Sequence, residues 1–480
     1  MHCRKWEKRA PEAARTRWPL LIVVFCALVV LIALRISPSV HQISRPIHHQ
    51  DSQSRAAGSR EVYTGLRQRL PGDSLLRPMP TAEEIVAQKL AQFGRSRRRF
   101  AHALARRHDV QISSDVGQFF DAVESGNWER IDAAFKRISG GDNSASQNDT
   151  RPAEVTKLWP AIIDAYGAAE QVHLWPAQKL LDYGNAILGA LRPGMVYVGG
   201  TDNGRWIPEL LNDTSGGESH VVITQNGLAA ADYQDYLRLQ YDDQLTNLSD
   251  EESQRAFAQY TADAQKRLEH DQQFPDEPKQ IRPGEDVRMV EGKVQVGGQV
   301  AVMSINELLL QTLMQKNPGL SFAVQESFPL NGTYADALPL GPLMELHAAN
   351  QDNTFSAERA AQSLDYWRDS VQQVLSDPEA STSETALRSY SHDAVAAANL
   401  LAAHNYSSDA EEAYRLATQL WPGNPESAGS LANLLATTGR DAEAQQLLDN
   451  FAREYPDQLQ ALERVRAATH LLWTAKSPGQ

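Results

Sequence analysis

The chain has 480 residues, of which 42% are hydrophobic, and this length and composition are typical of two or three globular domains. Its formal net charge is −14, yet residues 1–110 hold 20 Lys and Arg against 8 Asp and Glu, so a basic arm precedes an acidic body. An acidic surface repels phosphate, which excludes nucleic acid as the ligand of that body.

An uncharged apolar segment covers residues 18–34, between Arg17 and Arg35, and is near the lower length limit of a membrane-spanning helix. It ends without a small-x-small cleavage site, which favours an uncleaved signal-anchor at residues 18–36 over a cleaved signal peptide. Six Lys and Arg precede it, so the positive-inside rule predicts a cytoplasmic basic tail at residues 1–17. We therefore expect a single-pass protein of the inner (plasma) membrane, with an extracytoplasmic, periplasmic body after a flexible tether at residues 37–80.

Both cysteines belong to this N-terminal part, because Cys3 lies in the predicted tail and Cys26 in the predicted span. The body that follows contains no cysteine. It therefore forms no disulfide, and a metal or nucleophile site built on cysteine is excluded there.

A helical region is predicted at residues 81–139. Thr81 and Glu84 have the spacing of a capping box at the start of a helix that runs to about residue 108. Residues 115–138 predict a second helical pair with Gly126 at its turn. The first helix carries six arginines in its later part, namely Arg95, Arg97, Arg98, Arg99, Arg106 and Arg107. They form either a solvated helix face or a surface for anionic headgroups or an acidic partner.

Residues 153–350 change in pattern and predict an α/β domain. Short apolar runs at residues 195–198, 220–224, 300–303 and 320–325 are predicted as strands, and a hairpin is predicted over residues 288–296. Helical patterns separate most of these runs. Strands that alternate with helices at this spacing predict a small, mostly parallel sheet with flanking helices.

Polar loops follow two of the predicted strands, at the sheet edge where open α/β folds bind ligands. The candidate ligand-binding residues in these loops are Thr201, Asp202, Asn203, Arg205, Gln225 and Asn226, and Glu326 follows a third strand. Free loop amides at a helix start suit a carboxylate, a phosphate or a sugar hydroxyl. The alternative is structural, in which Gly and Asn form tight turns and Arg205 pairs with Asp202 or Glu209.

No catalytic constellation is recognisable in the sequence. The histidines are scattered without metal-ligand spacing, and neither a Gly-x-Ser-x-Gly motif nor a known phosphate-binding loop is present. We therefore predict no catalytic residue, no metal site and no cofactor.

The segments GGTDNGRWIPELL, VVITQNGLAAADYQDYLRLQY, SQRAFAQYTADAQKR, KVQVGGQVAVMSINELLLQ and FAVQESFPL resemble a bacterial family. The members of this family are protein O-mannosyltransferase-like membrane proteins, and the similar part is their extracytoplasmic soluble region. The resemblance covers about residues 180–375. It implies an envelope-facing location and a connection to glycan transfer. It assigns no reaction to this chain, because transfer in those proteins is attributed to their multi-span part.

A 34-residue repeat is predicted in the helical region at residues 356–475. Pro422 and Pro456 are 34 residues apart, and small residues recur at matching offsets, with Asn405 and Gly439 at the turns. Small residues, among them Ala410 and Ala444, suit the close crossing of paired helices. The pattern at about residues 391–456 resembles the tetratricopeptide repeat, which implies binding of a protein partner.

The predicted fold class is thus α/β plus all-α: a single N-terminal transmembrane helix, a small mostly parallel sheet domain and C-terminal tetratricopeptide-like hairpins. The predicted function is a membrane-anchored, envelope-facing module that binds or scaffolds a protein partner through the repeats. The alternative is linked to glycan transfer: an accessory enzyme, or a subunit that binds a glycan or another small polar ligand, through loops 199–205 and 225–227.

Overall fold

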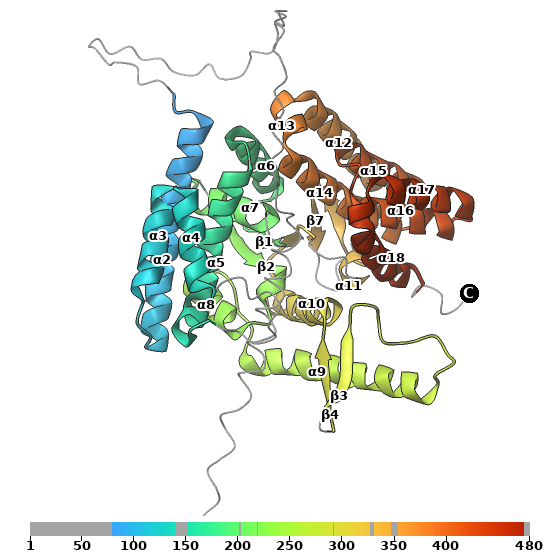
Figure 1. Cartoon of the computed structure of the whole chain (residues 1–480), viewed down its shortest axis with the longest axis horizontal. Helices are drawn as coiled ribbons and strands as arrows, with labels where there is room; N and C mark the ends of the chain where they lie inside the picture. Colours follow the sequence, from blue (N-terminus) through green and yellow to red (C-terminus); the bar gives the residue numbers. More distant parts are fainter. Residues whose placement is uncertain are drawn as a thin grey trace, which may run out of the picture.

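The structure is a computed structural model that describes residues 79–140, 151–200, 203–217, 219–290, 292–326, 331–346 and 354–474. Helices dominate it, and one small sheet lies near its middle (Figure 1). The N-terminal helices α2 to α5 lie at one end of the molecule, and the C-terminal helices α12 to α18 lie at the other.

Three helices begin the described chain, and they are α2 (Ala82–His108), α3 (Ser114–Ser125) and α4 (Trp128–Ile138). The predicted capping box is confirmed, because the Glu84 amide donates to the Thr81 hydroxyl while the Thr81 amide donates to the Glu84 carboxylate. Gly126 has a φ of 69° in the turn between α3 and α4, which is the left-handed conformation that glycine adopts easily.

A five-stranded mixed sheet has the strand order β2-β1-β5-β7-β6. Its strands are β1 (Val196–Gly199), β2 (Val221–Thr224), β5 (Phe322–Val324), β6 (Leu338–Leu340) and β7 (Leu343–Leu346). Strands β2, β1 and β5 are parallel, whereas β7 is antiparallel to β5 and to β6. The helices around β1 and β2 are α5 (Ala153–Leu174), α6 (Ala177–Ala190), α7 (Asn203–Asp213) and α8 (Ala231–Tyr241).

The predicted fold class is corrected in two respects, because the structure is mainly helical and the sheet is mixed. The apolar run at residues 300–303, predicted as a strand, is the first turn of helix α10 (Gln299–Lys316). A short apolar run fits a buried strand and a buried helix equally well, and here the run continues as a buried helix face through Leu313. The residues of β6 and β7 were not predicted as strands. These two strands form the two antiparallel pairings of the sheet, beside the two parallel pairings of β1 with β2 and β5.

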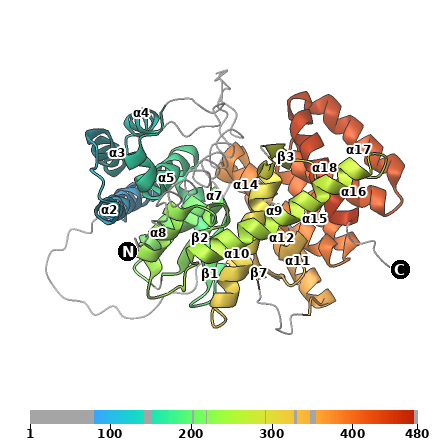
Figure 2. The ribbon, with the colours of Figure 1, turned by 90° about the horizontal axis from the view of Figure 1, so that it is seen from below.

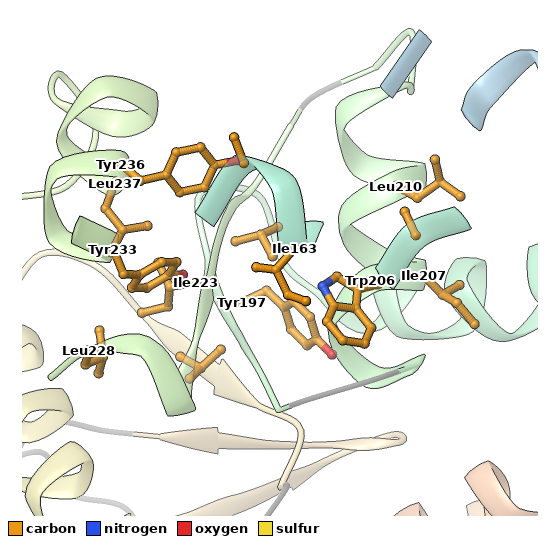
Figure 3. Close-up of a cluster of buried hydrophobic side chains, with 14 of the residues drawn as sticks. Ile163, Tyr197, Trp206, Ile207, Leu210, Ile223, Leu228, Tyr233, Tyr236 and Leu237 are labelled. Carbon is orange, nitrogen blue, oxygen red and sulfur yellow. The ribbon is translucent and has the colours of Figure 1, made fainter. Parts of the chain in front are cut away.

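An apolar cluster joins the parallel strands to three helices (Figure 3). Its labelled side chains come from α5, β1, α7, β2, α8 and the turn after β2, and all of them are buried. Helices α5 and α7 cross closely at Gly167, where a Cβ atom would lie 2.1 Å from the Trp206 ring. The amides of Val222 and Thr224 donate to the hydroxyls of Tyr241 and Tyr233 on α8, at 3.2 and 2.8 Å. The outer edge of β2 is therefore occupied by tyrosines rather than left open to another strand.

A long helix and a hairpin lie on one side of the sheet unit. Helix α9 (Asp250–Gln273) runs across the underside of the molecule, as Figure 2 shows, and contacts α10 and the hairpin of β3 (Asp286–Val290) and β4 (Lys293–Gly297). Of the α9 side chains only Ala256, Tyr260 and Ala264 are buried, so most of this helix faces solvent.

The C-terminal region forms antiparallel helical hairpins around a second hydrophobic core. Helix α11 (Asn331–Tyr334) belongs to the sheet unit, and the later helices are α12 (Ala357–Ser376), α13 (Pro378–Thr382), α14 (Glu384–Ala403), α15 (Ser407–Leu420), α16 (Pro425–Thr437), α17 (Asp441–Glu454) and α18 (Leu459–Thr474). Asn405 and Gly439 have φ values of 67° and 78° in the two turns. Ala410 and Ala444 are both buried. Membership of these hairpins in the tetratricopeptide family stays a prediction.

The predicted membrane protein is also corrected. Across the described ranges, no helix combines the length and the apolar character that are needed to cross a bilayer. Long helices such as α2 and α9 carry charged side chains along their length, and such side chains are costly in hydrocarbon. The predicted tail at residues 1–17, the signal-anchor at residues 18–36 and nearly all of the tether at residues 37–80 lie outside the described residues.

Candidate functional site

The carboxyl ends of three parallel strands meet at one edge of the sheet, where open α/β folds bind ligands. Gly199 at the end of β1 pairs with Thr224 at the end of β2, and Val198 pairs with Val324 of β5. Thr201 and Asp202 lie outside the described residues. The other four predicted site residues follow the ends of β1 and β2, with Asn203 and Arg205 in α7 and Gln225 and Asn226 in the turn η1 (Gln225–Gly227).

Arg205 points into the protein interior rather than toward an open crevice. Its side chain is 9% exposed, its guanidinium donates to the Asp164 carboxylate of α5, and its Nε lies 3.5 Å from Glu209 Oε2. The pairing with Glu209 was one of the two structural alternatives that the sequence left open. The pairing with Asp164, which is fully buried, was not predicted.

A second buried arginine completes this ion network. Nη2 of Arg97 on α2 lies 2.7 Å from both Glu209 and Asp213, and its Nε lies 3.5 Å from Asp164. The hydroxyl of Tyr236 donates to Asp164 at 2.8 Å. Two arginines and three carboxylates thus bind α2, α5 and α7 together.

Burial raises the pKa of Glu209 to about 8, and the neighbouring Asp164 carboxylate adds to this rise while Arg97 and Arg205 oppose it. Burial alone would lower the pKa of the Arg205 guanidinium, but Asp164 and Glu209 outweigh it and the pKa is raised. Arg205 therefore stays charged and is held inside the protein by its carboxylate partners. The two carboxylates compensate the charge of this buried guanidinium.

The turn after β2 is also fixed from inside. Gln225 and Asn226 are 2% and 7% exposed. The Thr224 hydroxyl accepts from the Asn226 amide at 3.3 Å and donates to the Gly200 carbonyl at 2.8 Å. Asn306 of α10 contacts the same turn, since its side chain donates to the Asn226 carbonyl at 3.5 Å. The two predicted site residues therefore belong to a pinned, buried turn.

Gly204 allows a side chain from β5 to approach the backbone of α7. A Cβ atom at this position would lie 1.3 Å from Oε1 of Gln325. Gly204 is therefore required for the packing of Gln325 against α7. This packing explains a glycine at position 204 without a bound phosphate.

Gln325 begins a polar junction between the sheet edge and the C-terminal helices. Its amide nitrogen donates to Asp393 of α14 at 2.6 Å and to the Tyr183 hydroxyl of α6 at 2.7 Å. The Tyr183 hydroxyl donates to Asp393 at 2.9 Å and accepts from Asn203 at 3.1 Å. Asn203 is thus the predicted site residue that joins this junction directly.

Glu326, the next residue, is buried, and its carboxylate binds two other elements directly. Its carboxylate accepts from Asn399 of α14 at 3.1 Å and from the Tyr334 hydroxyl of α11. The Tyr414 hydroxyl of α15 donates to Asn399 at 2.7 Å. Burial raises the pKa of Glu326 to about 7, although these hydrogen bonds oppose the rise.

His392 joins the same junction from α14. Its Nδ1 lies 2.7 Å from a Glu426 carboxylate oxygen, and its Nε2 lies 2.7 Å from the Glu326 carbonyl oxygen. Burial alone would lower the pKa of His392, but Glu426 outweighs it and raises the pKa to about 10. Both ring nitrogens face acceptors, which suits the protonated ring. Burial raises the pKa of Asp393 to about 6, with His392 opposing the rise.

We call this set of residues the sheet–helix junction: Asn203, Tyr183, Gln325, Glu326, Tyr334, His392, Asp393, Asn399 and Glu426. Sequence reasoning located Glu326 at a strand end but missed the groups from α6 and α14. The sequence could have indicated these groups, because the apolar run of α14 contains the polar residues Asp393 and Asn399, and both are buried. Nothing in that run indicates which strand they contact.

The geometry offers little space for a substrate beside the junction. A hollow lined by Glu326, Met344, Leu400 and neighbouring residues has room for about one water molecule. Within the described part of the chain, no group of three His, Cys, Asp or Glu is placed to hold a metal ion. The carboxylates are engaged in hydrogen bonds, so the arrangement positions helices rather than a reacting group.

Comparisons with known proteins add no relative, since no family model, no curated protein and no solved structure matches the chain.

Proposed function

We propose that the protein is a protein-binding scaffold that contacts a partner through the outer helices of its C-terminal region. The observation that carries this proposal is the sheet–helix junction. Helix α14 lies where an open α/β sheet receives its ligand, and Gln325 and Glu326 at the strand end bind Asp393 and Asn399 of that helix. The polar groups at the carboxyl ends of these strands thus join the sheet unit to the C-terminal helices.

The inner helices of the C-terminal region are already covered. Residues 427–435 of α16 are all buried, and α18 packs against this helix, where the Asn433 side chain donates to the Arg466 carbonyl at 3.3 Å. A partner must therefore contact the outer helices. Helix α17 exposes Gln445, Gln446 and Asp449 and is the natural docking element.

Helix α17 is anchored mainly through its apolar face, and exposed ion pairs to α15 add a smaller contribution. Arg440, at the N-cap position of this helix, pairs with Glu411 of α15, and Arg415 of α15 lies 3.0 Å from Glu443 of α17. Leu448 and Phe451 anchor the opposite face in the second core. Pre-ordered helices lose little conformational entropy when a partner binds.

A photo-crosslinking amino acid at Gln446 tests this surface, and the same residue at Gln259 of α9 is the matched control. Both positions are exposed glutamines on helices, but only the first lies on the proposed docking helix. We expect discrete protein adducts from position 446 and none from position 259 when the full chain is irradiated in its native cells. Equal adduct patterns from the two positions, or none from position 446, would refute the proposal.

A second candidate is a subunit that binds a glycan or another small polar ligand. The raised pKa values of Glu326 and Asp393 favour it, because perturbed carboxyls are frequent in active sites. Thermal shift against sugars, sugar phosphates and nucleotides separates the two candidates, since a ligand that binds the folded state raises its melting temperature. A saturable shift that Asp393→Asn abolishes would favour the second candidate over the scaffold.

A further inference from the structure

Four cationic or basic side chains lie in one row on the outer face of helix α2. Arg95, Arg99, His102 and Arg106 are all exposed, and their spacing of four, three and four residues places them on a single helix face. We call this row the α2 basic stripe. At a rise of 1.5 Å per residue it is about 16 Å long.

Other arginines of the same helix have acidic partners. Arg97 is in the buried ion network, Arg98 pairs with Asp121 and Glu124, and Arg107 pairs with Asp235. Among the residues that the structure describes, no acid lies within ion-pair distance of Arg95, Arg99 or Arg106. The helix thus separates its arginines into three that hold the fold and three that are unpartnered on one face.

The helix dipole stabilises only one of these three exposed arginines. Arg106 lies in the last turn, where a cation interacts favourably with the helix C-terminus. Arg95 and Arg99 lie more than two turns before His108, beyond the range of that effect. Two arginines are therefore exposed without any stabilising role in the described structure.

We propose that the α2 basic stripe binds an acidic helical segment of a protein partner. A helix with carboxylates at i, i+4, i+7 and i+11 matches the stripe in length and spacing. Charge selects this occupant, because residues 111–480, which include the helices packed against α2, hold 26 Lys and Arg against 52 Asp and Glu. A nucleic acid or an anionic bilayer extends beyond the stripe and meets the repulsive acidic body, whereas a short segment interacts within a Debye length of about 8 Å.

The stripe is independent of the docking surface proposed above. Helices α2 and α17 lie at opposite ends of the molecule in both overall views (Figures 1 and 2). One partner can therefore occupy α2 while another occupies α17, and the failure of either proposal leaves the other intact.

The test uses the full chain and a fluorescein-labelled helical peptide with four glutamates at the matching spacing. Fluorescence anisotropy gives its Kd for the wild type, for Arg95→Gln/Arg99→Gln, and for the control Arg255→Gln/Lys266→Gln. The control removes the same charge from exposed positions on α9. We expect the stripe variant to weaken binding about tenfold and the control to leave it within about twofold.

Circular dichroism serves to check that each variant remains folded. Equal weakening by the two variants would show that only net charge matters and would overturn the proposal, as would absence of peptide binding to the wild type at low ionic strength. A DNA duplex and phosphatidylserine vesicles are the remaining probes. Tighter binding of either one, lost in Arg95→Gln/Arg99→Gln, would overturn the choice of an acidic protein segment.

Discussion

Replacing Arg205 tests whether it braces the fold or binds a ligand. Arg205→Ala removes a nearly buried guanidinium from Asp164, which has no exposed surface, and from Glu209. Breaking a buried ion pair by removing one partner costs about 3–5 kcal/mol. Arg97 still lies 2.7 Å from Glu209 and 3.5 Å from Asp164. Because it compensates part of the loss, we expect the lower value, about 3 kcal/mol.

Urea denaturation measures this loss as a lower free energy of unfolding. The matched control is Arg415→Ala, which removes an arginine whose side chain is 48% exposed from its partners Glu411 and Glu443. Exposed pairs contribute at most about 1 kcal/mol, so the control should remain close to the wild type. Arg205→Met keeps most of the side-chain volume and separates the lost charge from lost packing.

A loss for Arg205→Ala no larger than that for Arg415→Ala would contradict a bracing role of Arg205. The bracing role would also be contradicted if Arg205→Ala left stability unchanged and abolished a thermal shift by a sugar phosphate or nucleotide, because Arg205 would then act on a ligand.

Four further substitutions test the helix crossings, the close approach at Gly204 and the titration of the junction. Leucine in place of Ala410 or Ala444 overpacks a buried helix crossing and should cost about 1–3 kcal/mol in urea denaturation, whereas an unchanged transition for Ala444→Leu contradicts the repeat register. Gly204→Ala places a Cβ atom against Gln325 and should destabilise the protein by a similar amount, while full stability would show that the close approach is unnecessary. The folded-state pKa of Glu326, about 7, lies above its ordinary value of 4.5, so its ionisation should lower stability as pH rises between these two values. Glu326→Gln should remove up to about 3 kcal/mol of that decrease, and parallel pH profiles of variant and wild type would disprove this assignment.

Local patterns in the sequence predicted several elements correctly. The capping box at Thr81, the turn at Gly126 and the strands β1 and β2 appear where side-chain chemistry and apolar runs placed them. The positive φ values of Asn405 and Gly439 agree with their predicted turn positions. These features depend on residues within a few positions of one another, so a single segment contains the information.

The candidate site was predicted only in part, and the reason is the direction of its side chains. The sequence identified Arg205, Gln225 and Asn226 as residues that follow strand ends, but the strand-end rule does not tell whether a side chain turns outward or inward. Arg205 turns inward because Asp164, 41 residues earlier, supplies a buried carboxylate. Gln225 and Asn226 are enclosed by a turn that α10 covers.

The sequence alone specifies the start of α2 at its capping box, the turn residues Gly126, Asn405 and Gly439, and the acidic character of the chain after its N-terminal arm. These are properties of short segments and of composition. The tertiary structure decided that the sheet is mixed and that α14 covers its carboxyl edge. It also decided that Arg97 and Arg205 share carboxylates from two other helices. The physical reason is that pairing between distant segments depends on how complete surfaces fit together, and neither spacing nor composition specifies that fit.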